Sequence, residues 1–381
     1  MSVPNLSDRS LVDVTPSLLA ALGVAEFTDT LGVGGADRVC LLMVDGLGWE
    51  LLQTYADDAP FLAGLASDDH PIQVGFPATT AVSVATLGTG LAAGEHGIVG
   101  ISFQVPGLPL LHALTWRGGT GPGPKDDMRD TAVPERVQPS ATVLERAAAA
   151  GISVSVAAPP LQRRSGLTRA ALRGAEFRSA YALGDVVAHV REALRAAPSF
   201  CYAYHGDLDL LGHVYGPGSD AWRYQLRAID HLAVDLASAL PPGALLAVVA
   251  DHGMVTLNPD EVFDADTLPV LSDGVAEIGG DIRARHVYAS PGAAADVLAT
   301  WRSVLGPTAE VLSRSEAVSH GWFGPHVSEL ALPRIGDVVT SALGGGGVVR
   351  TRAEHVEAKM AGHHGSHSSA ERLVPFLTVR G

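Results

Sequence analysis

The chain has 381 residues, of which 47% are hydrophobic and 18% are charged, so it can bury a large apolar core without disulfide staples. With 26 Lys and Arg residues against 41 Asp and Glu, its formal net charge of -15 argues against binding to nucleic-acid polymers or anionic membranes. A small phosphate-bearing substrate is still compatible with this charge, because bound cations can reverse the local field.

The first residues show no basic segment followed by an apolar core, and no apolar run approaches the length that spans a bilayer. The two cysteines, Cys40 and Cys201, lie inside apolar runs, which is typical of buried, reduced thiols. These features predict a cytoplasmic protein without a membrane association.

Three apolar runs predict buried parallel strands, and a carboxylate follows each of them. Open α/β sheets bind ligands beyond the carboxyl ends of their strands, so these carboxylates are expected to meet at one edge. The strands and the residues that follow them are 38–44 before Asp45, 200–204 before Asp207 and Asp209, and 245–250 before Asp251.

Helical patterns lie between the expected strands, for example over 141–147 and in a stretch with apolar residues three and four apart. The alternation of strands and helices predicts an α/β fold with a doubly wound, mainly parallel sheet flanked by helices. The apolar positions of the second pattern are Trp222, Leu226, Ile229, Leu232 and Leu236.

Residues from about 257 to 322 mix strand and helix patterns, including a strand-like run at 282–288, and predict a small cap lobe inserted in a single catalytic domain over 1–381. The Gly/Pro-rich stretch 117–127 predicts an exposed loop that could cover the site as a lid. Residues 344–347 are four glycines without a following Lys-Ser/Thr pair, which favours a turn over a phosphate-binding loop.

The segment Phe76-Pro77-Ala78-Thr79-Thr80 precedes an apolar stretch at 81–87 that predicts the beginning of a helix. A hydroxyl there is usually only a cap. The same position also offers backbone N–H groups and the positive end of the helix dipole to an anion. A threonine alkoxide formed beside a metal ion at this position would be a competent nucleophile.

Asp and His residues that suit a metal ion gather in the remaining motifs. Asp209 and His213 are four apart and can reach one ion on a helical turn, with His205 and Asp207 as nearby competitors. Asp251 and His252 can meet one ion only if the strand ends before them, because adjacent side chains of a strand point to opposite faces. The imidazole-rich segment 362–367 adds His363 and His364. Carboxylate and imidazole without thiolate suit zinc or a similar divalent metal.

The ordered set from Asp45 to His364 resembles the alkaline phosphatase superfamily, most closely its type I phosphodiesterase/nucleotide pyrophosphatase branch. Residues 76–80 through Thr89-Gly90-Leu91 and Glu95-His96-Gly97-Ile98 are similar to the nucleophile segment of that branch. The resemblance covers the catalytic framework and implies an alkaline phosphatase-like domain.

The resemblance also implies roles for individual residues. One zinc ion would be held by Asp209, His213 and His364, and a second by Asp45, Asp251 and His252. Thr80 would attack phosphorus in line and form a covalent intermediate that water then hydrolyses. Mn²⁺ or iron remains an alternative to zinc, because the ligand types alone do not separate these metals.

One position departs from the family pattern. Three residues after Thr80 the branch usually places an asparagine that donates to a phosphoryl oxygen, and this chain has Ser83 there. Ser83 is therefore a candidate donor with a shorter reach, and a different donor or a different substrate is the alternative.

The leading hypothesis from the sequence is thus a two-metal hydrolase of small phosphodiesters or pyrophosphates, such as nucleotides, acting through Thr80. A phosphonoacetate hydrolase-like enzyme that cleaves a C–P bond is similar in framework and is the alternative within the same site. From another class, the chain could be a noncatalytic metal-binding scaffold.

Overall fold

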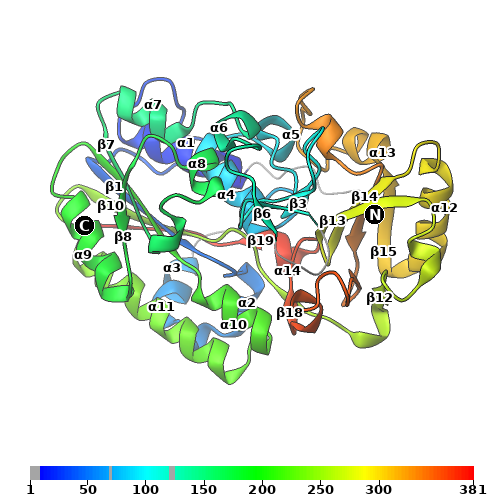
Figure 1. Ribbon diagram of the computed structural model, residues 1–381. Coiled ribbons are helices and arrows are strands. Elements are labelled where there is room, and N and C mark those ends of the chain that lie inside the picture. The colour runs from blue at the N-terminus through cyan, green and yellow to red at the C-terminus, as the bar shows by residue number, and fades with distance from the viewer. Residues whose placement is uncertain (1–8, 68–70, 120–124) are drawn as a thin grey trace.

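The computed structural model describes residues 9–67, 71–119 and 125–381, and a six-stranded sheet lies at its centre (Figure 1). The strand order is β20-β10-β1-β9-β7-β8. All neighbouring strands are parallel except β10 and β20, which confirms the mainly parallel sheet. The strands are β1 (Arg38–Val44), β7 (Ser153–Ala158), β8 (Glu176–Ser179), β9 (Ser199–His205), β10 (Ala244–Val249) and β20 (Phe376–Arg380).

Helices cover both faces of this sheet, which is why β1 and β10 can be apolar along nearly their whole length (Figure 1). On one side, α1, α4, α7 and α8 contact one another, and on the other α11 contacts α3 and α9. The helices are α1 (Leu11–Ala21), α3 (Pro60–Ala66), α4 (Thr80–Thr89), α7 (Val143–Ala149), α8 (Gly166–Ala171), α9 (Leu183–Ala193) and α11 (Asp220–Ser238).

The predicted helices are confirmed with shifted ends. The pattern at 141–147 corresponds to α7, which begins only at Val143 because the Thr142 side chain caps it. The apolar stripe from Trp222 to Leu236 is the buried face of α11. None of the helices in the described ranges is long and apolar enough to cross a membrane.

A second, four-stranded antiparallel sheet lies beside the first, with strand order β13-β14-β16-β15. Its hydrophobic cluster includes Trp301 of α12 and is distinct from the main core. Its strands and helices are β13 (Val275–Asp281), β14 (Ala284–Ala289), β15 (Ala309–Ser313), β16 (Val338–Ala342), α12 (Ala294–Leu305) and α13 (Arg314–Ser319). Because β16 and Val348 share this cluster, the cap inferred over 257–322 stays a prediction, and a boundary nearer 349 would fit the packing better.

Several two-residue strands and short helices complete the architecture. The predicted loop 117–127 contains a paired β5 and β6, and its middle, 120–124, lies outside the described residues. The four glycines at 344–347 form a turn that leads into β17, as expected, with Gly344 at a φ of 53°. These elements are α2 (Trp49–Thr54), α5 (Ala93–His96), α6 (Pro134–Val137), α14 (Ser369–Arg372), β2 (Ile72–Gln73), β3 (Ser102–Phe103), β4 (Leu111–His112), β5 (Arg117–Gly118), β6 (Asp126–Asp127), β11 (Val255–Thr256), β12 (Val262–Asp264), β17 (Gly347–Val349) and β19 (Leu373–Val374).

The two cysteines lie opposite each other on β1 and β9 as free, buried thiols. Burial raises the pKa of Cys201 to about 11, so this thiol stays protonated at neutral pH. The inference that both cysteines fill the core in reduced form is confirmed.

Candidate metal centre and active site

The carboxyl ends of three adjacent strands build one side of the site. β10, β1 and β9 are neighbours in the sheet, and the loops that follow them carry Asp251, Asp45 and helix α10 (Asp207–Tyr215). The backbone N–H of Asp45 donates to the His205 carbonyl at 2.9 Å, and this bond holds the loop after β1 against the end of β9. The convergence expected from the sequence therefore follows from the strand order.

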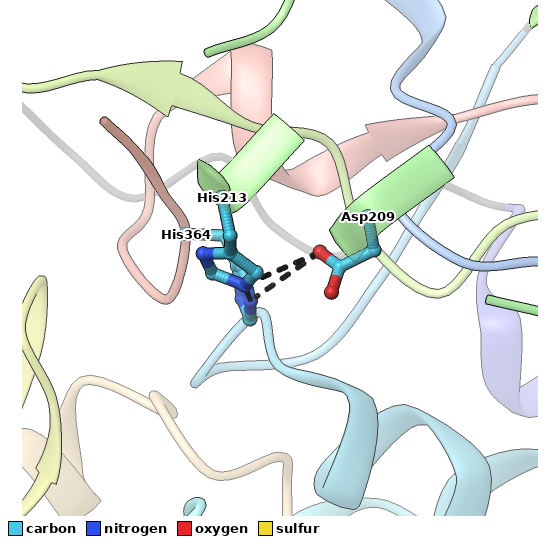
Figure 2. Close-up of side chains that lie close together, drawn as sticks. All are labelled: Asp209, His213 and His364. Atoms are coloured by element: carbon cyan, nitrogen blue, oxygen red, sulfur yellow. Dashed lines mark hydrogen bonds and ion pairs between the residues drawn. The ribbon is translucent and has the colours of Figure 1, made fainter. Parts of the chain in front are cut away.

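A first group of metal-ligand residues consists of Asp209, His213 and His364 (Figure 2). Asp209 and His213 lie one turn apart on α10, and His364 follows β18 (Gly362–His363). The distance from Asp209 Oδ1 is 3.4 Å to His213 Nε2 and 3.8 Å to His364 Nε2. The predicted helical turn brings Asp209 and His213 together, and the segment after β18 adds His364.

The hydrogen bonds of the two imidazoles decide which nitrogen of each ring carries the proton. Nδ1 of His213 lies 2.7 Å from the Gly362 carbonyl, and Nδ1 of His364 lies 2.8 Å from the Ala78 carbonyl. Because a carbonyl can only accept, each Nδ1 carries the proton and each Nε2 presents a lone pair. The two Nε2 atoms are only 3.2 Å apart. Two facing lone pairs repel each other, and a shared cation removes the conflict.

A second group contains Asp45, Asp209 and His252. His252 Nε2 lies 3.4 Å from Asp45 Oδ1 and 3.5 Å from Asp251 Oδ2. Its Nδ1 faces the Gly253 carbonyl at 3.0 Å, so Nδ1 carries the proton and Nε2 again presents the lone pair. Asp209 belongs to both groups, whereas the sequence analysis assigned it to the first ion alone. All six predicted ligands lie in this one place, and their division between two ions stays a prediction.

Two buried carboxylate oxygens in the centre have no hydrogen-bond partner among the described residues: Oδ1 of Asp209 and Oδ2 of Asp251. A buried carboxylate oxygen without a partner is costly unless a proton or a cation neutralises it. The donor set of carboxylates and neutral imidazoles therefore fits divalent metal ions.

The electrostatics of the metal-free protein agree with this fit. Burial, with the charge of Asp45 as the next cause, raises the pKa of Asp209 to about 7. Burial, with the charge of Asp209 second, raises the pKa of Asp251 to about 7. Burial also raises the pKa of Asp45 and lowers the pKa values of His252 and His364. The imidazoles of His252 and His364 are neutral at neutral pH and can bind metal, while protons compete with a metal ion for Asp209 and Asp251 up to about pH 7.

These shifts predict how the stability of the metal-free protein depends on pH. The folded pKa values of Asp209 and Asp251 lie above the ordinary value of 3.8, so the folded state binds more protons than the unfolded state between pH 3.8 and about 7. The contribution of these groups to the free energy of unfolding should therefore fall as pH rises through this window. Thermal denaturation in chelator across this range measures it, and Asp251→Asn should flatten the slope. An unchanged slope in that variant would contradict the assignment.

Thr80 is the first residue of α4 and lies against the second group. Its Oγ1 is 3.2 Å from His252 Nε2 and 3.4 Å from Asp45 Oδ1. The preceding Thr79 does not cap α4, because its hydroxyl donates to Asp281 Oδ1 at 3.1 Å. The uncapped N–H groups of a ten-residue helix thus remain at the position of the Thr80 hydroxyl.

Other candidates from the sequence lie elsewhere. Ser83 donates its hydroxyl proton to the backbone carbonyl of Asp251 at 2.7 Å, so a phosphoryl-donor role would require it to leave this partner. His205 Nε2 lies 2.8 Å from Gln225 Nε2, and Asp207 is exposed, which favours Asp209 over both competitors. His363 Nε2 faces the Met360 carbonyl at 3.2 Å.

Tyr204 is a site residue that the sequence analysis did not single out. Its hydroxyl donates to Asp45 Oδ2 at 2.6 Å and so orients this carboxylate. Tyr204 is the penultimate residue of β9 and pairs in register with Met43, two residues before Asp45. Only the strand order places it there, because nothing in the sequence shows that β1 and β9 are neighbours.

Replacing Tyr204 with phenylalanine should lower metal affinity or metal-dependent activity by about 10–100-fold, because the residues that orient metal ligands commonly contribute this much. Tyr202 offers a matched control on the same strand, since its buried hydroxyl has no hydrogen-bond partner among the described residues. Tyr202→Phe should leave both quantities unchanged. Equal behaviour of the two variants in a zinc titration would argue against an orienting role for Tyr204.

A cavity of about 370 Å³ opens next to the first metal-ligand group and includes Asp209, His213 and His364 in its wall. The rest of the wall comes from 101–119, Lys125, 280–282 and 353–363. Leu110, Leu114 and Met360 make part of it apolar. Asp281 contributes a buried carboxyl group with a pKa raised to about 7 by burial. Asp281 was not anticipated from the sequence, which carries no motif around it.

Comparison with known proteins places the geometry in context. A family model described as type I phosphodiesterase/nucleotide pyrophosphatase matches residues 39–367. The fold is similar to that of murine ectonucleotide pyrophosphatase/phosphodiesterase 5, solved as an inactive variant with AMP (TM-score 0.68, 20% identity, 90% of this chain and 87% of that chain). It is also similar to phosphonoacetate hydrolase from Sinorhizobium meliloti, solved with phosphonoacetate (TM-score 0.66, 19% identity, 91% of each chain).

Among curated proteins, the phosphopentomutase of Anaeromyxobacter dehalogenans is 30% identical over 172 residues. This match spans 44% of this chain and 41% of the relative, so it covers less than half of either protein. A second Anaeromyxobacter phosphopentomutase matches to the same extent. The likeness is therefore confined to a part of the framework.

Proposed function

Because the chain belongs to the type I phosphodiesterase/nucleotide pyrophosphatase family, we propose that it is a metal-dependent hydrolase of small phosphodiesters or pyrophosphates. The observation that supports this most strongly is the position of Thr80. Its hydroxyl lies at the N-terminus of α4, 3.4 Å from Asp45 Oδ1 and 3.2 Å from His252 Nε2, and both residues belong to the second metal-ligand group. A noncatalytic scaffold would not require a hydroxyl at this point.

In this proposal two zinc ions are held by Asp45, Asp209, His213, Asp251, His252 and His364. When bound, such ions neutralise charge on the phosphoryl group and favour the deprotonated form of a nearby hydroxyl. The lone-pair conflict of the two Nε2 atoms and the unpartnered carboxylate oxygens support occupancy of the centre.

The chain's own residues then position the reaction. Thr80 Oγ1 attacks phosphorus, the P–O bond to the leaving group breaks in line, and a phosphorylated or nucleotidylated threonine forms; water hydrolyses that ester in the second half-reaction. In the metal-free protein the hydroxyl lies within hydrogen-bond distance of His252 Nε2 and Asp45 Oδ1; with zinc held by these two residues, the proton would pass to water and the leaving group would depart with the electron pair of the broken P–O bond. The N–H groups at the beginning of α4 can bind a phosphoryl oxygen, a task that Ser83 cannot perform while it donates to Asp251.

The cavity beside the first group is the proposed site of one substrate substituent. Its volume of about 370 Å³ lies within the usual range for small-molecule sites, and its partly apolar wall suits an organic group. Residues 280–282, which lie within the predicted cap, and residues of the segment 101–119 line it. The structure adds the segment 353–363 to this wall.

Hydrolysis of a matched panel by the zinc-loaded protein tests the proposal. The panel comprises an aryl phosphodiester, an aryl phosphonate monoester, an aryl phosphomonoester and phosphonoacetate. We expect the diester to be hydrolysed fastest, because the family's substrates carry a substituent on each side of phosphorus. Phosphate release from phosphonoacetate alone would instead establish the C–P hydrolase alternative. No turnover of any compound by zinc-containing protein would favour the scaffold.

A further inference from the structure

A second cavity, of about 260 Å³, lies behind the nucleophile segment and shares no lining residue with the cavity at the metal centre. We call it the Arg372 cavity. It is lined by Phe76 and Arg372, and by the loop at 320–325. None of the described residues that line it is acidic.

Arg372 in this cavity is buried, with 6% of its surface exposed, yet it pairs with no carboxylate among the described residues. Its Nε donates to the Val74 carbonyl at 2.9 Å and its Nη2 reaches Gln73 Oε1 at 3.5 Å, which uses two of five N–H donors. Burial lowers its pKa to about 10, so the group stays charged at neutral pH. An unpaired buried charge is destabilising unless a counter-ion is bound.

Two other buried arginines have the carboxylate partner that Arg372 lacks among the described residues. Arg283 pairs with Glu371 at 2.8 Å, and Arg285 pairs with Glu354 at 2.6 Å. Glu371 directly precedes Arg372 but its two carboxylate oxygens bind Arg283. A fourth buried arginine, Arg334, donates through Nη1 to the Gly97 and Val137 carbonyls and also pairs with no carboxylate among the described residues. Of the two buried guanidinium groups without a carboxylate, only that of Arg372 lines this cavity.

Two further polar rings belong to the wall, those of Trp322 and His367. The indole Nε1 of Trp322 is buried without a hydrogen-bond partner among the described residues. Ser341 Oγ accepts the backbone N–H of His367 at 3.1 Å and lies 3.1 Å from its Nδ1, which holds the imidazole in place. The hydroxyl groups of Ser10 and Thr86 also belong to the wall, so its described residues offer hydrogen-bonding groups and a guanidinium charge but no carboxylate.

Aromatic rings form the remaining surface. Phe76 stacks on His367 with ring centroids 4.2 Å apart and meets the edge of Trp322 at 4.8 Å. Phe323 packs against Phe76 as well, at 5.7 Å. This wall favours an apolar body next to the charged group.

From the unpaired guanidinium, the wall without carboxylates and the aromatic rings, we propose that the Arg372 cavity binds a small organic anion. Its carboxylate or phosphoryl group pairs with Arg372, and its apolar part packs against Phe76 and Trp322. The site stands independently of the function proposed for the metal centre. Because Phe76 begins the segment that ends in Thr80, the ligand would lie directly behind the nucleophile.

Calorimetric titration with benzoate and with phenylphosphonate tests the proposal, with benzamide as the neutral probe. We expect saturable binding of at least one anion and none of benzamide, and the preferred anion identifies the head group. Arg372→Gln should weaken this binding at least about tenfold, as expected for a hydrogen-bonded charge pair. Trp322→Phe replaces the indole with a smaller aromatic ring without an N–H and should weaken it severalfold. Arg191→Gln, which removes an exposed charge on α9, should leave it unchanged.

Two results would overturn the proposal. The first is no saturable binding of either anion to the wild-type protein. The second is binding to Trp322→Phe and to Arg372→Gln that is as strong as binding to the wild-type protein. The second result would assign the signal to the metal centre. If Arg372→Gln does not fold, Trp322→Phe and Arg372→Lys, which keeps the charge but loses the planar fork, provide the same comparison.

Discussion

Replacing Thr80 with alanine should reduce kcat for an aryl phosphodiester by at least about a thousandfold, because loss of a covalent nucleophile removes the step that all later chemistry depends on. The substitution deletes only a hydroxyl and a methyl group next to His252 and Asp45. Zinc content and the melting temperature should stay close to the wild-type values, since Thr80 is not one of the proposed ligands. Steady-state kinetics of the zinc-loaded variant give the answer.

Two variants separate a nucleophile from a structural threonine. Thr80→Ser keeps a hydroxyl at the same place and should retain most of the activity. Thr89→Ala makes the same deletion at the other end of α4, where the hydroxyl donates to the Ala85 carbonyl, and should change only stability. If Thr80→Ala retains substantial turnover, the covalent mechanism is wrong even though the family assignment stands.

Adding zinc to the metal-free protein should stabilise it by about 4 kcal/mol when free zinc is a thousandfold above the dissociation constant. The reason is local: His213 and His364 hold two lone pairs 3.2 Å apart, and Asp209 presents an unpartnered oxygen to both. The variant His364→Asn should lose a large part of this stabilisation. Thermal denaturation with and without chelator measures the difference.

The adjacent His363 provides the control for this experiment. It is also buried, but its Nε2 faces the Met360 carbonyl at 3.2 Å. His363→Asn should therefore keep the zinc-dependent rise in melting temperature. The opposite pattern, with stabilisation lost in His363→Asn and kept in His364→Asn, would show that the ligand chosen from the family resemblance is the wrong one of the pair.

Much of the site could be predicted from short-range patterns. The turn that brings Asp209 and His213 to one place requires only a helix, and the end of β10 at Val249 allows Asp251 and His252 to approach the same position. The beginning of α4 at Thr80 was likewise evident from the apolar stretch that follows it. Each of these inferences depends on backbone periodicity, which a few neighbouring residues determine.

The limits of the prediction appear where partners are distant in the chain. Asp281 contacts Thr79 from 202 positions away, and the second hydrophobic cluster includes Val338 of β16 and Val348, which lie outside the range 257–322 predicted as a cap. Ser83 was a candidate donor by its position after Thr80, and only the folded chain shows that its hydroxyl donates to the Asp251 carbonyl. Hydrogen-bond partners of this kind depend on which strands and helices pack together.

The sequence by itself determined the strands, the buried helix faces and the identity of the residues at the carboxyl ends of β1, β9 and β10, because apolar periodicity and residue type are local properties. The tertiary structure alone decided that Tyr204 orients Asp45, that each metal-facing imidazole is held by a carbonyl through Nδ1, and that Arg372 is buried without a carboxylate. The physical reason is that orientation, protonation and charge compensation depend on contacts between segments that are far apart in the chain, and those contacts exist only once the sheet has assembled.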